Sequence, residues 1–207
     1  MKILVINGHP DEQSFSAAIF DEVVNNLDRS KHEIETLELN KMSFDPVLRL
    51  GYREHMPDDP EIEKSQAIIQ WADHFIFIYP IWWSTMPSLL KGWIDSVFTP
   101  RIAYSSNQQG NFFLNYLRGR QFKPLLKGKT ADIITTSMAP TFWYRLFSGF
   151  ISVPDSYGIS SLKNAVLNHC GIKTKKIMVL GNLGRESNTL KKRQLFLNKV
   201  RQHALTL

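Results

Sequence analysis

The chain has 207 residues, of which 43% are hydrophobic and 21% charged, with one cysteine and a net charge of +6. These values are ordinary for a globular protein, and the length suffices for one domain with a full core, so we expect a single domain over residues 1–207. A lone cysteine, Cys170, excludes an intramolecular disulfide and a cysteine cluster for zinc, and we expect no metal site. The basic residues are scattered without a recognition motif, which argues against nucleic-acid binding.

The excess of positive charge has two interpretations. It is either a solvated basic surface or a source of attraction for anionic ligands such as dinucleotides. The apolar run at residues 3–6 is too short for the core of a signal peptide, and no run approaches the roughly 20 residues of a membrane span. Together with the single cysteine, these features predict a cytoplasmic protein without an integral membrane segment.

The first element is a strand over residues 2–7, because its near-continuous apolar run is typical of a central parallel strand. A polar turn follows, and Ser14 or Ser16 can begin a helix that runs to about Leu27. This arrangement offers backbone N–H groups and the positive end of a helix dipole to a phosphate. The alternative is an ordinary turn with a serine N-cap, in which His9 only closes the turn.

The middle of the chain predicts a strand at residues 32–39, an irregular stretch to residue 60, and a helix over residues 60–72. A buried aromatic strand at residues 75–79 ends at Pro80, and a helix begins at Pro87. Between them lies Ile81-Trp82-Trp83-Ser84-Thr85, two tryptophans in a loop at the carboxyl end of a strand. Ligands bind at such ends in open α/β sheets, and this loop suits a large planar ligand.

The second half predicts strands at residues 131–136 and 176–180 and helices at 160–169 and 188–205, with Gly171 as a helix stop. Residues 99–129 show no clear period, which indicates a functional insertion or lid. The loop at 137–158 is rich in aromatic residues, which form a lid, a binding wall, a subunit interface or the edge of the core. Strands alternate with helices throughout, so the fold class is α/β, a flavodoxin-like three-layer fold with a five-stranded parallel sheet.

Several short motifs resemble those of the flavodoxin-like NAD(P)H:quinone reductase family, and together they span most of the chain. The most specific is the block from Pro80-Ile81-Trp82-Trp83 through Met86-Pro87 and Leu90-Lys91-Gly92-Trp93 to Phe98. The others, in chain order, are Gly8-His9-Pro10, Ser14-Phe15-Ser16, Phe44-Asp45-Pro46, Ala72-Asp73, Ala103-Tyr104, Thr135-Thr136 and His169-Cys170-Gly171.

The resemblance implies an NAD(P)H dehydrogenase (quinone), a flavin enzyme that transfers two electrons by ping-pong hydride transfer from NAD(P)H to a quinone or similar acceptor. It also implies a homodimer whose subunits complete each other's sites. FMN is the expected flavin, with FAD as the alternative. The cofactor-binding residues it implies are His9, Ser14, Phe15, Ser16, Pro80, Ile81, Trp82, Trp83, Thr135, Thr136 and Ser137. The backbone N–H groups of Trp82 and Trp83 are the expected donors to the ring edge, and Tyr104, Phe142 and Trp143 the expected substrate pocket.

The sequence departs from the family pattern at two places. Ser137-Met138-Ala139-Pro140 stand where glycines often follow the paired threonines. No histidine lies between His74 and His169, and Trp143 or Tyr144 stands where family members often carry a tyrosine. Tyr144 is therefore a candidate for a catalytic proton role, and the catalytic group stays open. The alternatives are a flavodoxin-type electron carrier, which the charge of +6 opposes, and an ancillary regulatory flavoprotein of a potassium efflux system.

Overall fold

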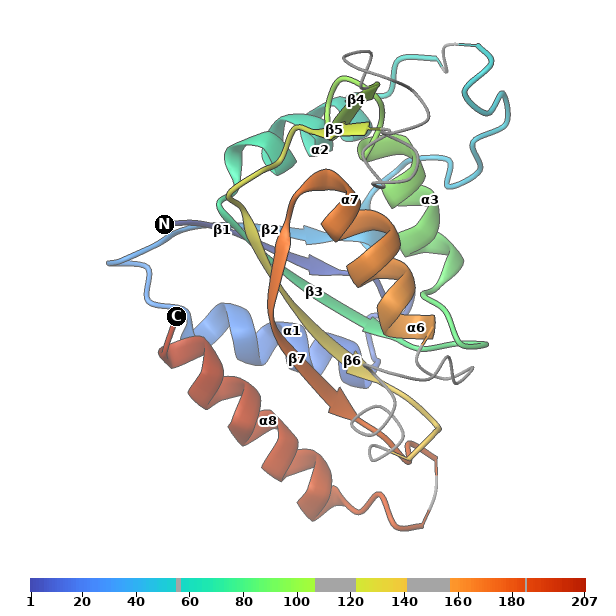
Figure 1. The fold of residues 1–207 in the computed structure, drawn as a ribbon. Coiled ribbons are helices and arrows are strands. Elements are labelled where there is room, and N and C mark those ends of the chain that lie inside the picture. The colour runs from blue at the N-terminus through green and yellow to red at the C-terminus, as the bar shows by residue number, and fades with distance from the viewer. Residues whose placement is uncertain (55–56, 107–121, 141–156, 185) are drawn as a thin grey trace.

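The computed structural model describes residues 1–54, 57–106, 122–140, 157–184 and 186–207 (Figure 1). The strands of the main sheet are β1 (Lys2–Asn7), β2 (Glu33–Glu38), β3 (His74–Pro80), β6 (Thr130–Thr136) and β7 (Lys173–Leu180). The longer helices are α1 (Phe15–Asn26), α2 (Pro60–Trp71), α3 (Ser88–Val97) and α8 (Leu190–Leu205). A short 3-10 turn, η1 (Leu39–Lys41), follows β2.

The sheet has the order β2-β1-β3-β6-β7, and all its neighbouring strands are parallel. Counted along the chain, this is the 2-1-3-4-5 order of doubly wound flavodoxin-like sheets, so the expected fold class is confirmed. The order reverses direction at β1 and β3, which makes the carboxyl ends of these two strands the place where a ligand is expected.

Helices cover both faces of the sheet (Figure 1). On one face α1 and α8 pack on sheet side chains such as Val5 and Ile78, and Val200 of α8 is in the same cluster. On the other face α2, α3 and the run from α6 (Tyr157–Ser160) to α7 (Asn168–Cys170) pack around Phe77 and Trp93. The central strands are apolar on both faces because each face is covered, as expected for a parallel sheet.

Two short strands lie in the segment for which the sequence showed no period. β4 (Tyr104–Ser106) and β5 (Phe122–Pro124) pair antiparallel, and β5 contacts α7. Strands of three residues are too short to show an alternating pattern. β7 begins at Lys173, three residues before the expected start, because its first residues are lysines of an edge strand rather than apolar residues of a central one.

The helical run at residues 157–170 is not a regular α-helix. Its middle, η3 (Ser161–Leu167), is π-helical, with a wider turn than an α-helix. Leu162 and Leu167 are therefore buried, whereas Ala165 between them is exposed. The run ends at Gly171, whose φ of +88° confirms it as the helix stop.

A buried ionic cluster lies towards the amino ends of the strands. Asp132 of β6 is 0% exposed, and its Oδ2 lies 2.6 Å from Nε2 of His203 on α8 and 3.4 Å from Nε2 of His74 on β3. Its Oδ1 accepts the backbone N–H of Lys176 at 3.0 Å, at the place where the register of β7 skips Lys175. One carboxylate therefore connects α8, β3 and the β7 bulge.

Candidate functional site

The turn after β1 is held by a series of local hydrogen bonds. The His9 N–H donates to Asn7 Oδ1, the Asp11 N–H donates to His9 Nδ1, and the Gln13 N–H donates to Asp11 Oδ1. Short polar side chains that accept from the backbone two residues away are a common way to build such turns. The chain enters α1 in a defined position as a result.

Helix α1 begins with its first N–H groups directed out of the helix. Ser14 is the N-cap, and its Oγ accepts the Ala17 N–H at 3.2 Å. The N–H groups of Phe15 and Ser16 precede Ala17 and have no acceptor within the helix by geometry. They face the ligand side of the turn with the positive end of the helix dipole behind them, which is a favourable environment for an anion.

The protonation state of His9 follows from its surroundings. Burial lowers the pKa of the His9 imidazole, and the neighbouring Asp11 opposes this only in part. Near neutral pH the ring is therefore neutral. Because Nδ1 accepts the Asp11 N–H at 2.9 Å, the proton of the neutral ring is on Nε2, which can donate to a ligand.

The loop after β3 forms a tight turn. The Trp82 and Thr85 backbones exchange two hydrogen bonds of 2.9 Å, and φ is +49° at Trp83 and +57° at Ser84. This is a type I′ turn, which usually carries Asn-Gly at its centre. A non-glycine residue in this conformation costs about 1–3 kcal/mol. Both central residues of the turn, Trp83 and Ser84, therefore carry backbone strain.

The turn presents both indoles outward. Trp83 is 99% exposed and Trp82 is 44% exposed. Because the Trp82 N–H already donates to Thr85, the expectation that this group binds the edge of a ring is wrong. That role stays a prediction for the N–H of Trp83.

The segment after β6 closes on itself and on the loop after β7. Ser137 Oγ accepts the Ala139 N–H at 3.0 Å, and the carbonyls of Ser137 and Ala139 accept the N–H groups of Leu183 and Asn182. A serine side chain and a tie to the neighbouring loop thus shape this edge, where relatives of the resembled family often have glycines.

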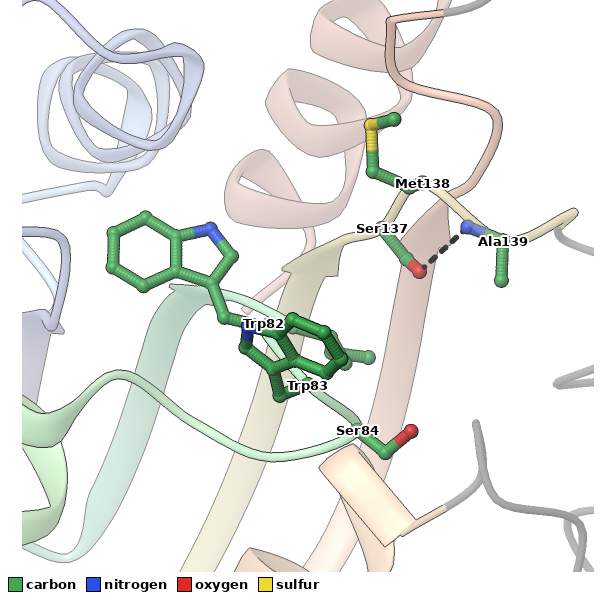
Figure 2. A pocket seen from close by; sticks show the side chains of 7 residues that line it. Trp82, Trp83, Ser84, Ser137, Met138 and Ala139 are labelled. Carbon is green, nitrogen blue, oxygen red and sulfur yellow. Dashed lines mark hydrogen bonds between the residues drawn. The ribbon is translucent and has the colours of Figure 1, made fainter.

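Two adjoining hollows lie at the carboxyl ends of these strands. The larger, of about 450 Å³, lies between the tryptophan turn and residues 137–139 (Figure 2). The smaller, of about 160 Å³, extends from it towards the first turn. Both are bounded by Ile81, Trp82, Ser137 and Met138. The smaller hollow also has His9, Phe15, Ser16, Pro80, Thr136 and Leu183 in its wall.

Most of the expected cofactor-binding residues thus line one or both hollows, and two of them, Ser14 and Thr135, do not. Ser14 caps α1 rather than lining a hollow. Thr135 is buried in β6, and its hydroxyl donates to the Tyr79 carbonyl at 2.7 Å. Sequence reasoning did not select Ser84, Met138, Ala139 and Leu183, which line the hollows. Their position directly after strand ends is the signal that would have found them.

The expected substrate residues lie elsewhere or outside the described residues. Tyr104 is on β4, with its ring centroid 5.3 Å from that of Phe122 and 5.5 Å from that of His169. It belongs to this cluster and not to the wall of either hollow. Phe142, Trp143 and Tyr144 lie outside the residues that the structure describes.

The shape and chemistry of the hollows fit a flavin mononucleotide. The larger hollow offers flat apolar walls for a ring system, and the smaller offers the His9 Nε2–H and the α1 N-terminus for an anionic group. Within the described ranges, no group of three His, Cys, Asp or Glu side chains could hold a metal ion. Nor does the described part of the chain contain a helix with the length and apolarity needed to cross a membrane.

The family is settled by comparison with known proteins. A family model described as a flavodoxin-like fold matches residues 1–204. The crystal structure of Smu.1420 from Streptococcus mutans is 37% identical, each chain covers 100% of the other, and the TM-score is 0.81.

Two curated relatives carry enzyme names. A ribosyldihydronicotinamide dehydrogenase-like protein of Penicillium crustosum is 29% identical over 66% of this chain and 57% of its own. NAD(P)H dehydrogenase [quinone] 1 of Cavia porcellus is 30% identical over 50% of this chain and 45% of its own. The chain thus spans about half the length of these two relatives. With the fold, the strand order and the match over residues 1–204, the chain belongs to the family of flavodoxin-like proteins.

Proposed function

We propose that this protein is a flavin-dependent NAD(P)H oxidoreductase that reduces a quinone or a similar acceptor. The observation that carries the proposal is the pair of adjoining hollows, one walled by Trp82 and Trp83 and the other by His9 and the start of α1. Both are on the ligand-binding edge of a flavodoxin-like sheet. The enzyme names of the curated relatives support the same reaction class.

The residues have distinct parts in this proposal. The His9 Nε2–H and the N–H groups of Phe15 and Ser16 bind the phosphate of FMN, while Ile81, Trp82 and Met138 bury its ring system. When bound, a flavin supplies the ability to take a hydride from NAD(P)H and to pass two electrons to an acceptor. The chain's own contribution is to orient the flat partners and to exclude water, which is what a hydride transfer needs most.

We also propose that the protein works in the cytoplasm as a homodimer. Trp83 and Met138 both line the larger hollow, and their side chains are 99% and 64% exposed. Large apolar side chains exposed on two adjoining loops are unfavourable in water and favour an interface there. A sedimentation mass equal to a single chain of 23.9 kDa at micromolar concentration would contradict the dimer.

Identification of the bound cofactor and steady-state kinetics test the reaction. The purified protein should be yellow, and mass spectrometry of the released molecule should identify FMN. Anaerobic addition of NAD(P)H alone should bleach the flavin absorbance, and a quinone should restore it. Double-reciprocal plots should be parallel because donor and acceptor use the same hollow in turn. A colourless protein that takes up neither FMN nor FAD contradicts the proposal, and intersecting plots contradict the shared hollow.

A further inference from the structure

Gly158 lies so close to the floor of the hollows that a side chain has no room there. A Cβ placed on Gly158 would lie 2.6 Å from Cγ2 and 2.9 Å from Cγ1 of Ile81. Real Cβ atoms do not approach other atoms so closely, and Ile81 would have to move. Gly158 is in the short helix α6, and this close approach to Ile81 accounts for a residue without a side chain at that position.

The same residue is tied to the end of β3 by a buried hydrogen bond. The Tyr79 hydroxyl donates to the Gly158 carbonyl at 2.8 Å, and Tyr79 is completely buried. The carbonyl of Tyr79 in turn accepts the Thr135 hydroxyl. A buried bond of this kind fixes distance and direction, because breaking it leaves a polar group without a partner. It therefore holds α6 in register with the ends of β3 and β6.

Ile81 is the point where this contact reaches the ligand side. It lines both hollows. Its backbone cannot shift easily, because its N–H donates to the Thr136 carbonyl at 2.8 Å. The position of the Ile81 side chain is therefore determined by its packing against Gly158 of α6, on the side away from the hollows.

We propose that Gly158 is a positioning residue for the flavin, which sets the depth of the floor by fixing Ile81 while the Tyr79 hydroxyl holds α6 against it. This inference rests on the proposed function in that the ligand is a flavin. A larger residue at 158 pushes Ile81 into the two hollows that it lines. Side-chain volume at position 158 thus controls flavin affinity without any contact to the flavin.

The test is a double-mutant cycle on flavin affinity, measured by fluorescence titration of apoprotein with FMN. Gly158→Ala should raise Kd about tenfold or more, because inserting a methyl group into a packed site is strongly unfavourable. Ile81→Ala removes all three Ile81 atoms that the new methyl would meet. In that background, Gly158→Ala should change Kd by less than about threefold. The difference between the effects of Gly158→Ala with and without the Ile81 side chain is the coupling that the cycle measures.

Ala165→Ser is the matched control, because it adds one heavy atom to the exposed side of the same helical run. It should bind FMN as the wild type does. Tyr79→Phe provides an independent variant if Gly158→Ala does not fold, and it should weaken FMN binding through the loss of its bond to Gly158. Wild-type affinity in Gly158→Ala, or equal effects of this substitution with and without Ile81, would overturn the proposal.

A measurement without flavin separates this proposal from the proposed function. In NMR spectra of the apoprotein, the indole N–H resonance of Trp82, next to Ile81, should shift in Gly158→Ala and Tyr79→Phe but not in Ala165→Ser. If the wild type binds no flavin and these shifts are present, the contact stands and the choice of ligand fails. Unchanged Trp82 resonances in both variants mean that position 158 does not set the floor.

Discussion

The imidazole of His9 meets the indole of Trp82 edge to face, with ring centroids 5.3 Å apart and planes at 77°. This contact joins the turn after β1 to the turn after β3, and so it joins the anion end of the site to its aromatic end. A ligand that spans both hollows therefore meets two loops that already support one another.

His9→Phe separates the two roles of this ring. Phenylalanine keeps an edge-to-face contact with Trp82 but has no Nε2–H to donate. We expect weaker binding of FMN by about 1.5–3 kcal/mol, the usual value of a hydrogen bond to a charged group. Riboflavin, which has no phosphate, should bind to both proteins alike. An equal loss for FMN and riboflavin in fluorescence titrations would mean that His9 does not face the phosphate.

Ser16→Asp tests the start of α1 as the anion site. Ser16 is buried in the wall of the smaller hollow, so a carboxylate there would lie beside the phosphate. Like charges at short range in such a site cost on the order of 1–4 kcal/mol, so FMN affinity should fall about tenfold or more. Asparagine has nearly the same shape as aspartate but no charge, so the Ser16→Asn variant should bind FMN clearly more tightly than the Ser16→Asp variant. Equal FMN affinities of the two folded variants would place the phosphate elsewhere.

Trp83→Asn distinguishes a binding role from a structural one. Asparagine tolerates a positive φ better than tryptophan, and the indole of Trp83 has almost no packing to lose. In solutions dilute enough for the chain to be monomeric, the melting temperature of the apoprotein should therefore stay the same or rise. If the indole packs on the flavin or its partner, binding should weaken by roughly 1–3 kcal/mol, as for the burial of a large apolar group. A lower melting temperature with unchanged binding would contradict both expectations.

Asp132→Asn should destabilise the protein in a pH-dependent way. Burial by itself would raise the pKa of Asp132, but the hydrogen bond from His203 and the adjacent His74 imidazole outweigh it and lower the pKa to about 2. Because the folded-state pKa lies below the ordinary value of 3.8, the stabilisation is present above pH 3.8 and is lost as the pH falls towards 2. Removing a hydrogen bond to a buried charged group typically costs about 1.5–3 kcal/mol.

Urea denaturation at several pH values measures this effect. The wild type should be clearly more stable than Asp132→Asn at pH 5 to 7, and the difference should shrink as the pH approaches 2. Asp73→Asn is a suitable comparison, because Asp73 is an exposed carboxylate at the start of the same strand pair. A constant difference between wild type and Asp132→Asn over the whole range would contradict the assignment.

Elements with strong local signals were predicted closely from the sequence. β1 was expected at residues 2–7 and lies there, and the run of apolar residues that identifies it is a direct result of burial on both faces. α2 was expected to begin at Pro60 and does so, with Asp59 as its N-cap. In both cases the signal that identifies the element lies within a few neighbouring residues.

Features that depend on distant residues could not be predicted in this way. The Trp82 N–H donates to the Thr85 carbonyl because the loop forms a type I′ turn, and a Trp-Ser pair does not predict such a turn. The π-helical turns of η3 changed which residues face the core. The contact of Gly158 with Ile81 joins positions 77 residues apart, and no periodic pattern reports such a pair.

The outermost strand of the sheet limits how copies of this chain can meet. β7 carries Lys173, Lys175 and Lys176 at an edge of the sheet and is bulged between them. Charge and a broken register make such an edge a poor template for another strand. Sheet extension of one copy onto another through β7, and growth into fibrils through this edge, are thus disfavoured. In the homodimer proposed above, the two copies would instead meet through the loops at the carboxyl ends of the strands, where the contact would also shield the indoles from water.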